Sequence, residues 1–255
     1  NTAVTSILSI NNVLTSGISK INDVDLGSGG GGTPWISTIY DFNSEARETN
    51  QNNDWSPSAA YAADGWANGQ VVINGSQWTS GVQAKGVNSN YANTPSSFTG
   101  PAGGMTSTTN GATNSSSTQR YLYKETSGGR NIYDHICRTP GYNFSSLMNN
   151  TSNNLRLVMW YHAYGNTTWS GNLFQVFSDT GQTSTGAVST TVYTLPAAGN
   201  LMAQTNSPYI VQNIDLNAYR TSPATYYFYL LLSPQPVGTT YRHDTAIDTV
   251  YFEEY

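Results

Sequence analysis

The sequence is poor in charged residues. Asp, Glu, Lys and Arg make up 10% of its 255 residues, against roughly 25% in ordinary globular proteins. The 10 Lys and Arg residues are scattered and the formal net charge is −5, so no basic patch could neutralise a row of phosphates. Nucleic acid is therefore not an expected partner, and the surface is expected to be polar but largely uncharged.

Cysteine and long apolar runs are also scarce. Cys137 is the single cysteine, so no disulfide can form within the chain, which fits assembly in a reducing cytoplasm. No catalytic signature surrounds it, and we expect Cys137 to be a small buried apolar residue.

No apolar run reaches the roughly 18 residues that a membrane helix needs, and no charged segment followed by an apolar one marks an export signal. We expect neither membrane insertion nor export.

Motifs that carry catalysis are missing as well. The three histidines do not have the spacing of metal ligands. The serines form no Gly-x-Ser-x-Gly elbow, which a serine hydrolase would need. His162 is expected to be a hydrogen-bonded histidine within a sheet. Glycoside hydrolysis needs two carboxylates across a cleft. Nothing singles out a pair among the five glutamates, which are Glu45, Glu48, Glu125, Glu253 and Glu254. We therefore expect no enzymatic activity.

What the sequence does contain begins with a repeat of eleven residues. Residues 7–13 (ILSINNV) are followed by residues 18–24 (ISKINDV), and each unit is broken by Asn-Asn or Asn-Asp, which favour tight turns. Two such units cannot bury their own apolar faces. Residues 1–26 are expected to dock on another copy or a larger assembly, the alternatives being a loose tail or an edge hairpin on the main domain. The docking residues would be Ile7, Ile10, Asn11, Val13, Ile18, Ile21, Asn22 and Val24.

A glycine-rich linker, residues 27–34, precedes a single domain of residues 35–255. The apolar segments of this domain are short and separated by turn-rich stretches, which predicts an all-β sandwich. Residues 155–164 are apolar on both alternating faces, as in a central strand, and residues 209–216 mix apolar and polar residues, as in an outer strand. Residues 94–119 are expected to form a long surface loop. The expected strands are Gln70–Ile73, Tyr121–Lys124, Leu155–Tyr164, Leu173–Phe177, Thr191–Leu195, Tyr209–Leu216, Ala224–Leu232 and Thr249–Glu254.

Aromatic residues and three aspartates are the candidate binding groups. The 18 Tyr and 6 Trp residues suit flat contacts with sugars or protein surfaces, or else pack within the sheets. Asp41, Asp244 and Asp248 are either ligands of a structural calcium ion held where the two ends of the domain meet, or solvated carboxylates in turns.

Several segments, taken in order, resemble the MAM domain, an adhesion module with a jelly-roll sandwich fold. The chain departs from that family in having one cysteine where MAM domains carry disulfides, and Gly103-Gly104-Met105 where Asp-His-Thr usually follows Gly-Pro. The resemblance spans residues 38–253 and implies a jelly-roll β-sandwich with a calcium site near Asp41 and Asp244. The matching segments are Tyr40–Phe42 with Asp54-Trp55, Gly100-Pro101, Tyr121–Glu125 before Ser127-Gly128, Leu155–Gly165 with Gly171–Leu173, and Asp244–Phe252.

The N-terminal repeat is similar to the Ile-x-x-Ile-Asn-Gly-Val segments at the start of many tailed-phage virion proteins, with Asn or Asp in place of Gly. The two resemblances together imply a non-enzymatic bacteriophage virion surface protein, a tail fibre or a capsid decoration, made in the host cytoplasm. Residues 1–26 would bind capsid or tail proteins, with a trimer favoured, and the jelly roll would face host-surface glycans. The alternatives are a secreted carbohydrate-binding or adhesion module and a glycan-degrading enzyme.

Overall fold

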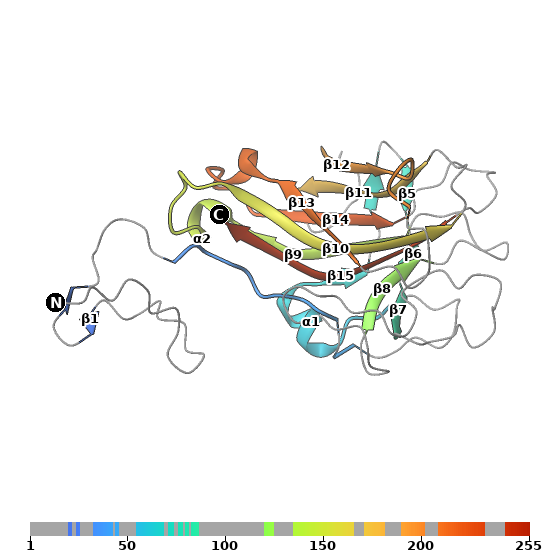
Figure 1. The fold of residues 1–255 in the computed structure, drawn as a ribbon, viewed down its shortest axis with the longest axis horizontal. Helices are drawn as coiled ribbons and strands as arrows, with labels where there is room; N and C mark the ends of the chain where they lie inside the picture. The colour runs from blue at the N-terminus through green and yellow to red at the C-terminus, as the bar shows by residue number, and fades with distance from the viewer. Residues whose placement is uncertain are drawn as a thin grey trace.

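Two β-sheets packed face to face form the body of the protein (Figure 1). The structure is a computed structural model. No helix in the described ranges is long and apolar enough to cross a membrane. The structure describes residues 20–21, 24–25, 33–42, 44–45, 55–68, 71–73, 76–78, 80–81, 83–86, 120–124, 135–165, 171–181, 190–201, 209–232 and 243–255.

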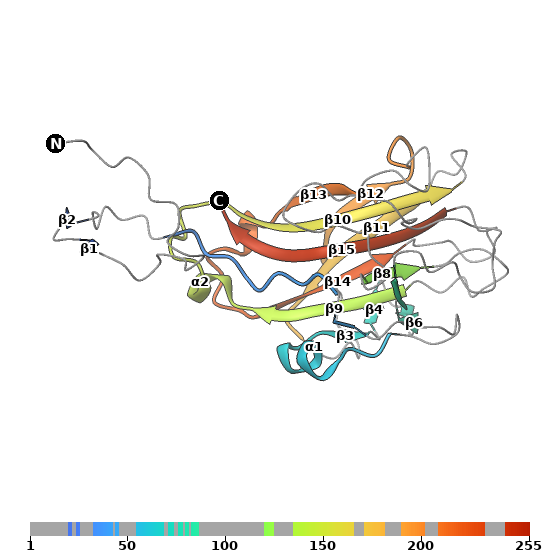
Figure 2. The same ribbon diagram turned by 60° about the horizontal axis from the view of Figure 1, so that its bottom comes forward.

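The first sheet has five strands in the spatial order β13-β10-β15-β8-β7, and every neighbouring pair is antiparallel. Long β10 and β15 lie side by side at its centre (Figure 2). The strands are β7 (Gln83–Gly86), β8 (Arg120–Lys124), β10 (Leu155–Gly165), β13 (Ile210–Asp215) and β15 (His243–Glu254).

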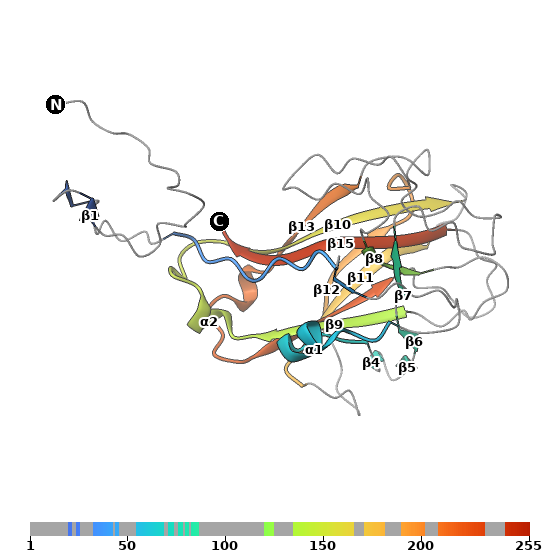
Figure 3. The same ribbon diagram turned by 90° about the horizontal axis from the view of Figure 1, so that it is seen from below.

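The second sheet has six strands, ordered β12-β11-β14-β9-β3, with β6 also paired to β9. Its pairs are antiparallel apart from the parallel pair of β6 and β9. Figure 3 shows β9 in the layer that faces β10 and β15. The strands are β3 (Ala67–Asn68), β6 (Ser80–Gly81), β9 (His135–Tyr142), β11 (Asn172–Asp179), β12 (Thr190–Pro196) and β14 (Tyr226–Leu232).

The remaining elements are short. A glycine stops the first helix, because Gly65 adopts φ +104° and its N–H bonds back to the last turn. Two further two-stranded pairs are β1 with β2 and β4 with β5. The bounds are β1 (Lys20–Ile21), β2 (Val24–Asp25), β4 (Val71–Ile73), β5 (Ser76–Trp78), α1 (Ala59–Asp64), α2 (Phe144–Leu147) and the 3₁₀ turn η1 (Asn217–Tyr219).

Alternation of side chains explains why β10 occupies the centre of its sheet. Successive residues of a strand point to opposite faces, and in β10 the odd-numbered residues from 155 to 163 enter the main core while Val158, Trp160 and His162 point to the other face. All of these side chains are buried. A strand that is apolar on both faces is typical of a covered position in the middle of a sheet, and β10 lies between β13 and β15.

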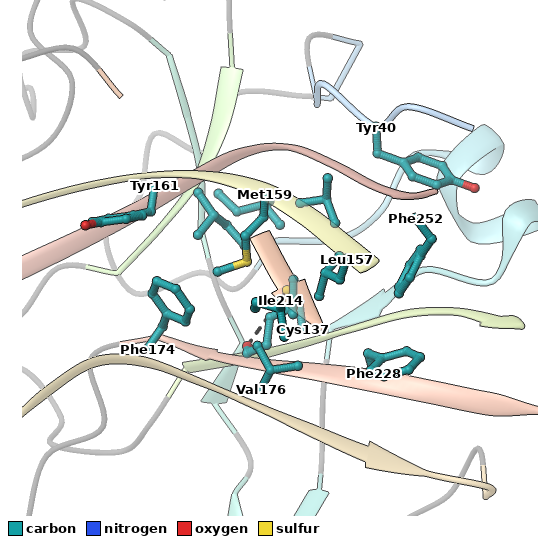
Figure 4. Close-up of a cluster of buried hydrophobic side chains, with 14 of the residues drawn as sticks. Tyr40, Cys137, Leu157, Met159, Tyr161, Phe174, Val176, Ile214, Phe228 and Phe252 are labelled. Atoms are coloured by element: carbon teal, nitrogen blue, oxygen red, sulfur yellow. Dashed lines mark hydrogen bonds between the residues drawn. The ribbon is translucent and has the colours of Figure 1, made fainter. Parts of the chain in front are cut away.

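The core lies between the sheets. Figure 4 shows Met159 of β10 pointing toward the layer that holds Phe174 and Val176 of β11, and the Tyr161 and Phe174 rings meet edge to face at 5.6 Å. Burying each large apolar side chain contributes roughly 1.5–3 kcal/mol. Cys137 is fully buried in the same cluster, as the sequence predicts, and burial raises the pKa of its thiol.

An N-terminal strap, defined here as residues 33–42, runs along the C-terminal half of β15 (Figure 1). Ile36 pairs with Glu253 and Tyr40 with Val250, both antiparallel. At the end of the strap, Phe42 enters an aromatic cluster with Tyr61, Trp55 and Trp66. The strap thus occupies the side of β15 that β8 covers farther along the strand.

The all-β sandwich and most of its strands confirm the sequence prediction. Residues 155–164 fall within central β10 and residues 209–216 contain edge strand β13. The sequence prediction lacks β9 and the short strands β3, β5, β6 and β7, and β15 begins at His243 rather than Thr249. The expected loop, residues 94–119, lies outside the described residues.

Candidate functional site

The outer face of the six-stranded sheet gathers aromatic and charged side chains from three adjacent strands. Strand register places Tyr229 of β14 between Arg138 of β9 and Phe177 of β11. Two residues earlier in β14, on the same face, Tyr227 lies between Gly141 of β9 and Asp179 of β11. We call the group of Arg138, Gly141, Asp179, Tyr227 and Tyr229 the Tyr227 face.

An apolar floor supports the Tyr227 face. Ile136, Phe177, Tyr229 and Leu231 form a buried cluster of their own, separate from the main core, and Tyr227 packs against it. Four buried apolar side chains on the outer side of a sheet fix the positions of the half-buried residues around them. The residues at the surface of this group therefore have a rigid base.

Gly141 gives the Tyr227 ring its place on the sheet. A Cβ atom on residue 141 would lie 2.7 Å from two carbons of that ring, closer than carbon atoms can pack. The Arg138 guanidinium carbon lies 5.2 Å from the ring centroid, within the range of a cation–π contact. The missing side chain and the guanidinium together hold the ring close to the backbone of β9.

Hydrogen bonds fix the charged groups beside the ring. Arg138 Nη2 donates to the carbonyl of Gly65 at 3.2 Å, and the Gly181 N–H donates to Asp179 Oδ1 at 3.1 Å. The Tyr229 hydroxyl donates to the carbonyl of Gly181 at 2.9 Å. Asp179 Oδ2 is shielded from solvent and has no hydrogen-bond partner among the described residues. This oxygen is a buried acceptor without a donor in the part of the chain that the structure describes.

Tyr229 remains a neutral hydroxyl at this site. Burial is the main reason that its pKa is raised, the Asp179 charge acts in the same direction, and the Arg138 charge opposes both. A hydroxyl that stays protonated at neutral pH keeps its donor function and its bond to Gly181. The site therefore places the half-buried Tyr227 ring beside the Arg138 guanidinium and Asp179, above the buried Tyr229 ring.

These groups suit a flat ligand that has an apolar face and polar edges. The ring of Tyr227 offers contact area, while Asp179 accepts and Arg138 donates hydrogen bonds. Sequence reasoning missed this site, because its residues come from strands about 40 or more positions apart. The Tyr-Tyr-Phe-Tyr alternation in β14 was the available signal, since it places Tyr227 and Tyr229 on one face.

The outer face of the five-stranded sheet is also aromatic, but its rings are buried. Trp160 and Tyr209 form one cluster, Tyr121 and Tyr123 belong to another with Ala246, and His162 meets Tyr209 at 5.9 Å. The exposed fraction of these aromatic side chains is 6% or less. Rings enclosed in this way stabilise the sheet and are less suited than Tyr227 to receive a ligand.

The predicted calcium ligands are only partly described. Asp41 is exposed at the end of the strap, and Asp244 and Asp248 belong to β15, so these two are not turn residues. Asp248 is buried and its Oδ1 accepts the N–H of Thr249 at 2.7 Å. Within the described ranges no three His, Cys, Asp or Glu side chains gather into a metal site. A structural calcium ion stays a prediction.

Of the predicted docking residues, Ile21 and Val24 alone are described. They pair in the short ladder of β1 and β2, with Lys20 opposite Asp25. The other docking residues, Ile7, Ile10, Asn11, Val13, Ile18 and Asn22, lie outside the described residues. Docking through residues 1–26 stays a prediction.

The glutamates that the structure describes have structural partners. Glu45 accepts hydrogen bonds from the Trp55 indole at 2.6 Å and from both the N–H and the hydroxyl of Ser58. Glu253 forms an ion pair with Arg156, and Glu254 accepts from four donors. Glu48 and Glu125 lie outside the described residues. The described glutamates act as structural acceptors.

No protein-family model and no curated protein matches the chain. Among solved structures, it is similar to the K2 and K1 cleaved adhesin domains of Lys-gingipain from Porphyromonas gingivalis. The K2 comparison has 12% identity, a TM-score of 0.46 and coverage of 87% of this chain and 98% of that one. The K1 comparison has 12% identity, a TM-score of 0.45 and coverage of 85% of this chain and 96% of that one. CBM27-1 of Caldicellulosiruptor saccharolyticus, solved with mannohexaose, has 12% identity, a TM-score of 0.29 and coverage of 52% and 74%.

Proposed function

We propose that the chain is a non-enzymatic carbohydrate-binding or adhesion module that holds a sugar ring on the Tyr227 face. The observation that carries the proposal is the placement of the Tyr227 ring over Gly141, with the Arg138 guanidinium against the ring and Asp179 opposite it on β11. A pyranose has an apolar face that can lie on a tyrosine ring and a hydroxyl rim that can donate to a carboxylate. Asp179 is half-buried and lies opposite Tyr227 on β11, where it supplies the carboxylate of this face.

A binding role also agrees with the hydrogen bonds that the described glutamates accept from the protein itself. Glu45 and Glu254 are buried, and each is surrounded by donors from the protein itself. General acid–base catalysis on a glycoside needs a carboxyl pair directed at the substrate, and these two groups are directed at the backbone and side chains of the fold. The protein is therefore expected to bind glycans without cleaving them.

The test is a glycan array followed by titration calorimetry on the best ligand. Tyr227→Ala is expected to weaken binding at least tenfold, equivalent to about 1.4 kcal/mol. Tyr255→Ala is the matched control, since Tyr255 is also a tyrosine under an arginine, with the Arg156 guanidinium carbon 4.3 Å from its ring centroid. Equal affinities for the two variants, or no glycan bound by the native chain, would reject the proposal.

Attachment to a phage particle is a separate question. It rests on the repeat in residues 1–26 and stays a prediction of the sequence. The Tyr227 face belongs to the sandwich and not to residues 1–26, so glycan binding at Tyr227 is expected with or without attachment to a particle.

A further inference from the structure

Strand β13 forms one edge of the five-stranded sheet and pairs with β10 alone among the described strands. The N–H of Leu216 donates to the carbonyl of Leu155, which fixes the phase of this antiparallel ladder. Hydrogen-bonded positions alternate along such a ladder, so the backbone groups of Val211, Asn213 and Asp215 point away from β10. In keeping with this phase, the Gln212 side chain donates to the carbonyl of Asn213 at 3.1 Å.

Among the described residues, this edge has few of the features that protect edge strands. Natural edges carry Lys, Pro or bulges that discourage pairing with another chain, but β13 reads Ile-Val-Gln-Asn-Ile-Asp and its register with β10 is unbroken. Ile210 and Val211 are 42% and 38% exposed. The opposite edge strand of the same sheet, β7, contains a lysine, Lys85.

We infer that β13 is a self-pairing edge, which joins β13 of a second copy antiparallel across a two-fold axis at Asn213. The two Asn213 residues would exchange N–H to carbonyl bonds, the Gln212 side chain would release the carbonyl that it holds, and Val211 would face Asp215 of the partner. An isologous contact of this kind closes after two copies. The two five-stranded sheets would become one continuous sheet.

The low charge of β13 permits a second copy as the occupant of this edge. Asp215 is the single charged residue of the strand, and the two-fold axis at Asn213 sets the two Asp215 residues four positions apart. At about 3.4 Å per residue this is roughly 13 Å, which exceeds the screening length of about 8 Å at physiological salt. A register shifted toward residue 215 would bring the two carboxylates together, so charge disfavours that shift and permits the Asn213 register.

The consequence for binding would be two Tyr227 faces in each assembly. The pairing itself does not depend on glycan binding, because β13 and the Tyr227 face belong to different sheets. If both hold, a surface carrying many glycans would be bound by two sites at once, and apparent affinity would exceed that of one site.

Light scattering coupled to size exclusion tests the pairing on the full chain over a series of concentrations. The native chain is expected at twice the monomer mass of 27.6 kDa. Asn213→Pro removes an outward N–H that β10 does not use, which an edge strand tolerates, and is expected to weaken the dimer at least tenfold. Val211→Lys, which adds a charge at the edge, is expected to do the same.

Thr190→Lys is the matched control, because it adds the same charge to the exposed start of the other sheet's edge strand, β12. It should leave the dimer intact, and circular dichroism should give all variants the same β-sheet spectrum. A native chain that stays monomeric at every concentration, or forms a trimer, would overturn the inference. So would a dimer that is insensitive to both Asn213→Pro and Val211→Lys.

Discussion

Glu254 ties two other stretches of chain to the C-terminal strand through one buried carboxylate. Its oxygens accept the N–H of Trp35 in the strap at 3.0 Å, the N–H groups of Asn149 and Asn150 at 3.0 Å each, and the side-chain amide of Asn153 at 2.6 Å. A carboxylate satisfied by several N–H donors is one of the stronger polar arrangements in a protein interior.

Glu254→Gln is expected to lower the free energy of unfolding by about 1.5–3 kcal/mol. The amide nitrogen of glutamine is a donor, so it would face donors on one side of the site and leave them unpaired. Urea denaturation provides the measurement. Glu253→Gln is the control, since its partly exposed ion pair with Arg156 is worth at most about 1 kcal/mol. A loss as large for Glu253→Gln would contradict the role assigned to Glu254.

At the scale of elements, the strap completes the sandwich. Tyr40 and Phe42 are 6% and 0% exposed, and their rings pack against Tyr61 and Trp66. The main-chain bonds of the strap satisfy the edge of β15 beside it, with Tyr40 and Val250 exchanging both of theirs. The strap therefore belongs to the folded domain as much as β15 does.

Two truncations test this assignment. Removal of residues 1–32 is expected to leave the melting temperature nearly unchanged, whereas removal of residues 1–42 should abolish the cooperative transition. Loss of a single large aromatic core side chain costs about 3–5 kcal/mol, so loss of Tyr40 and Phe42 together approaches the whole stability of a typical domain. Thermal melts followed by circular dichroism distinguish the outcomes. A shortened chain that lacks residues 1–42 yet melts like the longer one would show that the strap is dispensable.

Elements with a clear apolar pattern could be predicted, and those whose pattern is interrupted could not. β10 was recognisable because both of its faces are apolar. β9 was missed because it contains Pro140-Gly141, a pair typical of turns, which the sheet accommodates by a shift of register against β14. The start of β15 was missed because its aspartates suggested turns. The Tyr227 face depends on which strands become neighbours, and local patterns do not specify non-local pairing.

At the scale of the whole molecule, buried tyrosines make stability sensitive to alkali. Burial is the largest cause of a raised pKa at Tyr40, Tyr61, Tyr142, Tyr161, Tyr193 and Tyr229. At Tyr161 the pKa is raised to about 12. An unfolded tyrosine loses its proton near pH 10, so above that pH the unfolded state binds fewer protons than the folded state. The contribution is fully present below about pH 10 and is lost as the pH rises through the folded values.

The free energy of unfolding is therefore expected to fall steeply above about pH 10, by up to about 1.4 kcal/mol per pH unit for each such tyrosine. Urea denaturation at a series of alkaline pH values measures the slope. Tyr161→Phe keeps the ring in the core but removes the titrating hydroxyl, and its curve should fall less steeply between about pH 10 and about pH 12. Parallel curves for this variant and the native chain would mean that Tyr161 is not among the groups responsible.

The strap also determines how the domain would respond to a pull on its N-terminus. The bonds from Glu254 to Trp35, from Ser37 to Phe252 and between Tyr40 and Val250 lie across the direction of the two antiparallel segments. A tension transmitted along residues 33–42 would load these bonds together, in shear, and would not peel them apart one after another. If the N-terminus is held by a surface or a particle and the sheet binds a moving partner, the strap carries the load. The strap would then resist being pulled off β15.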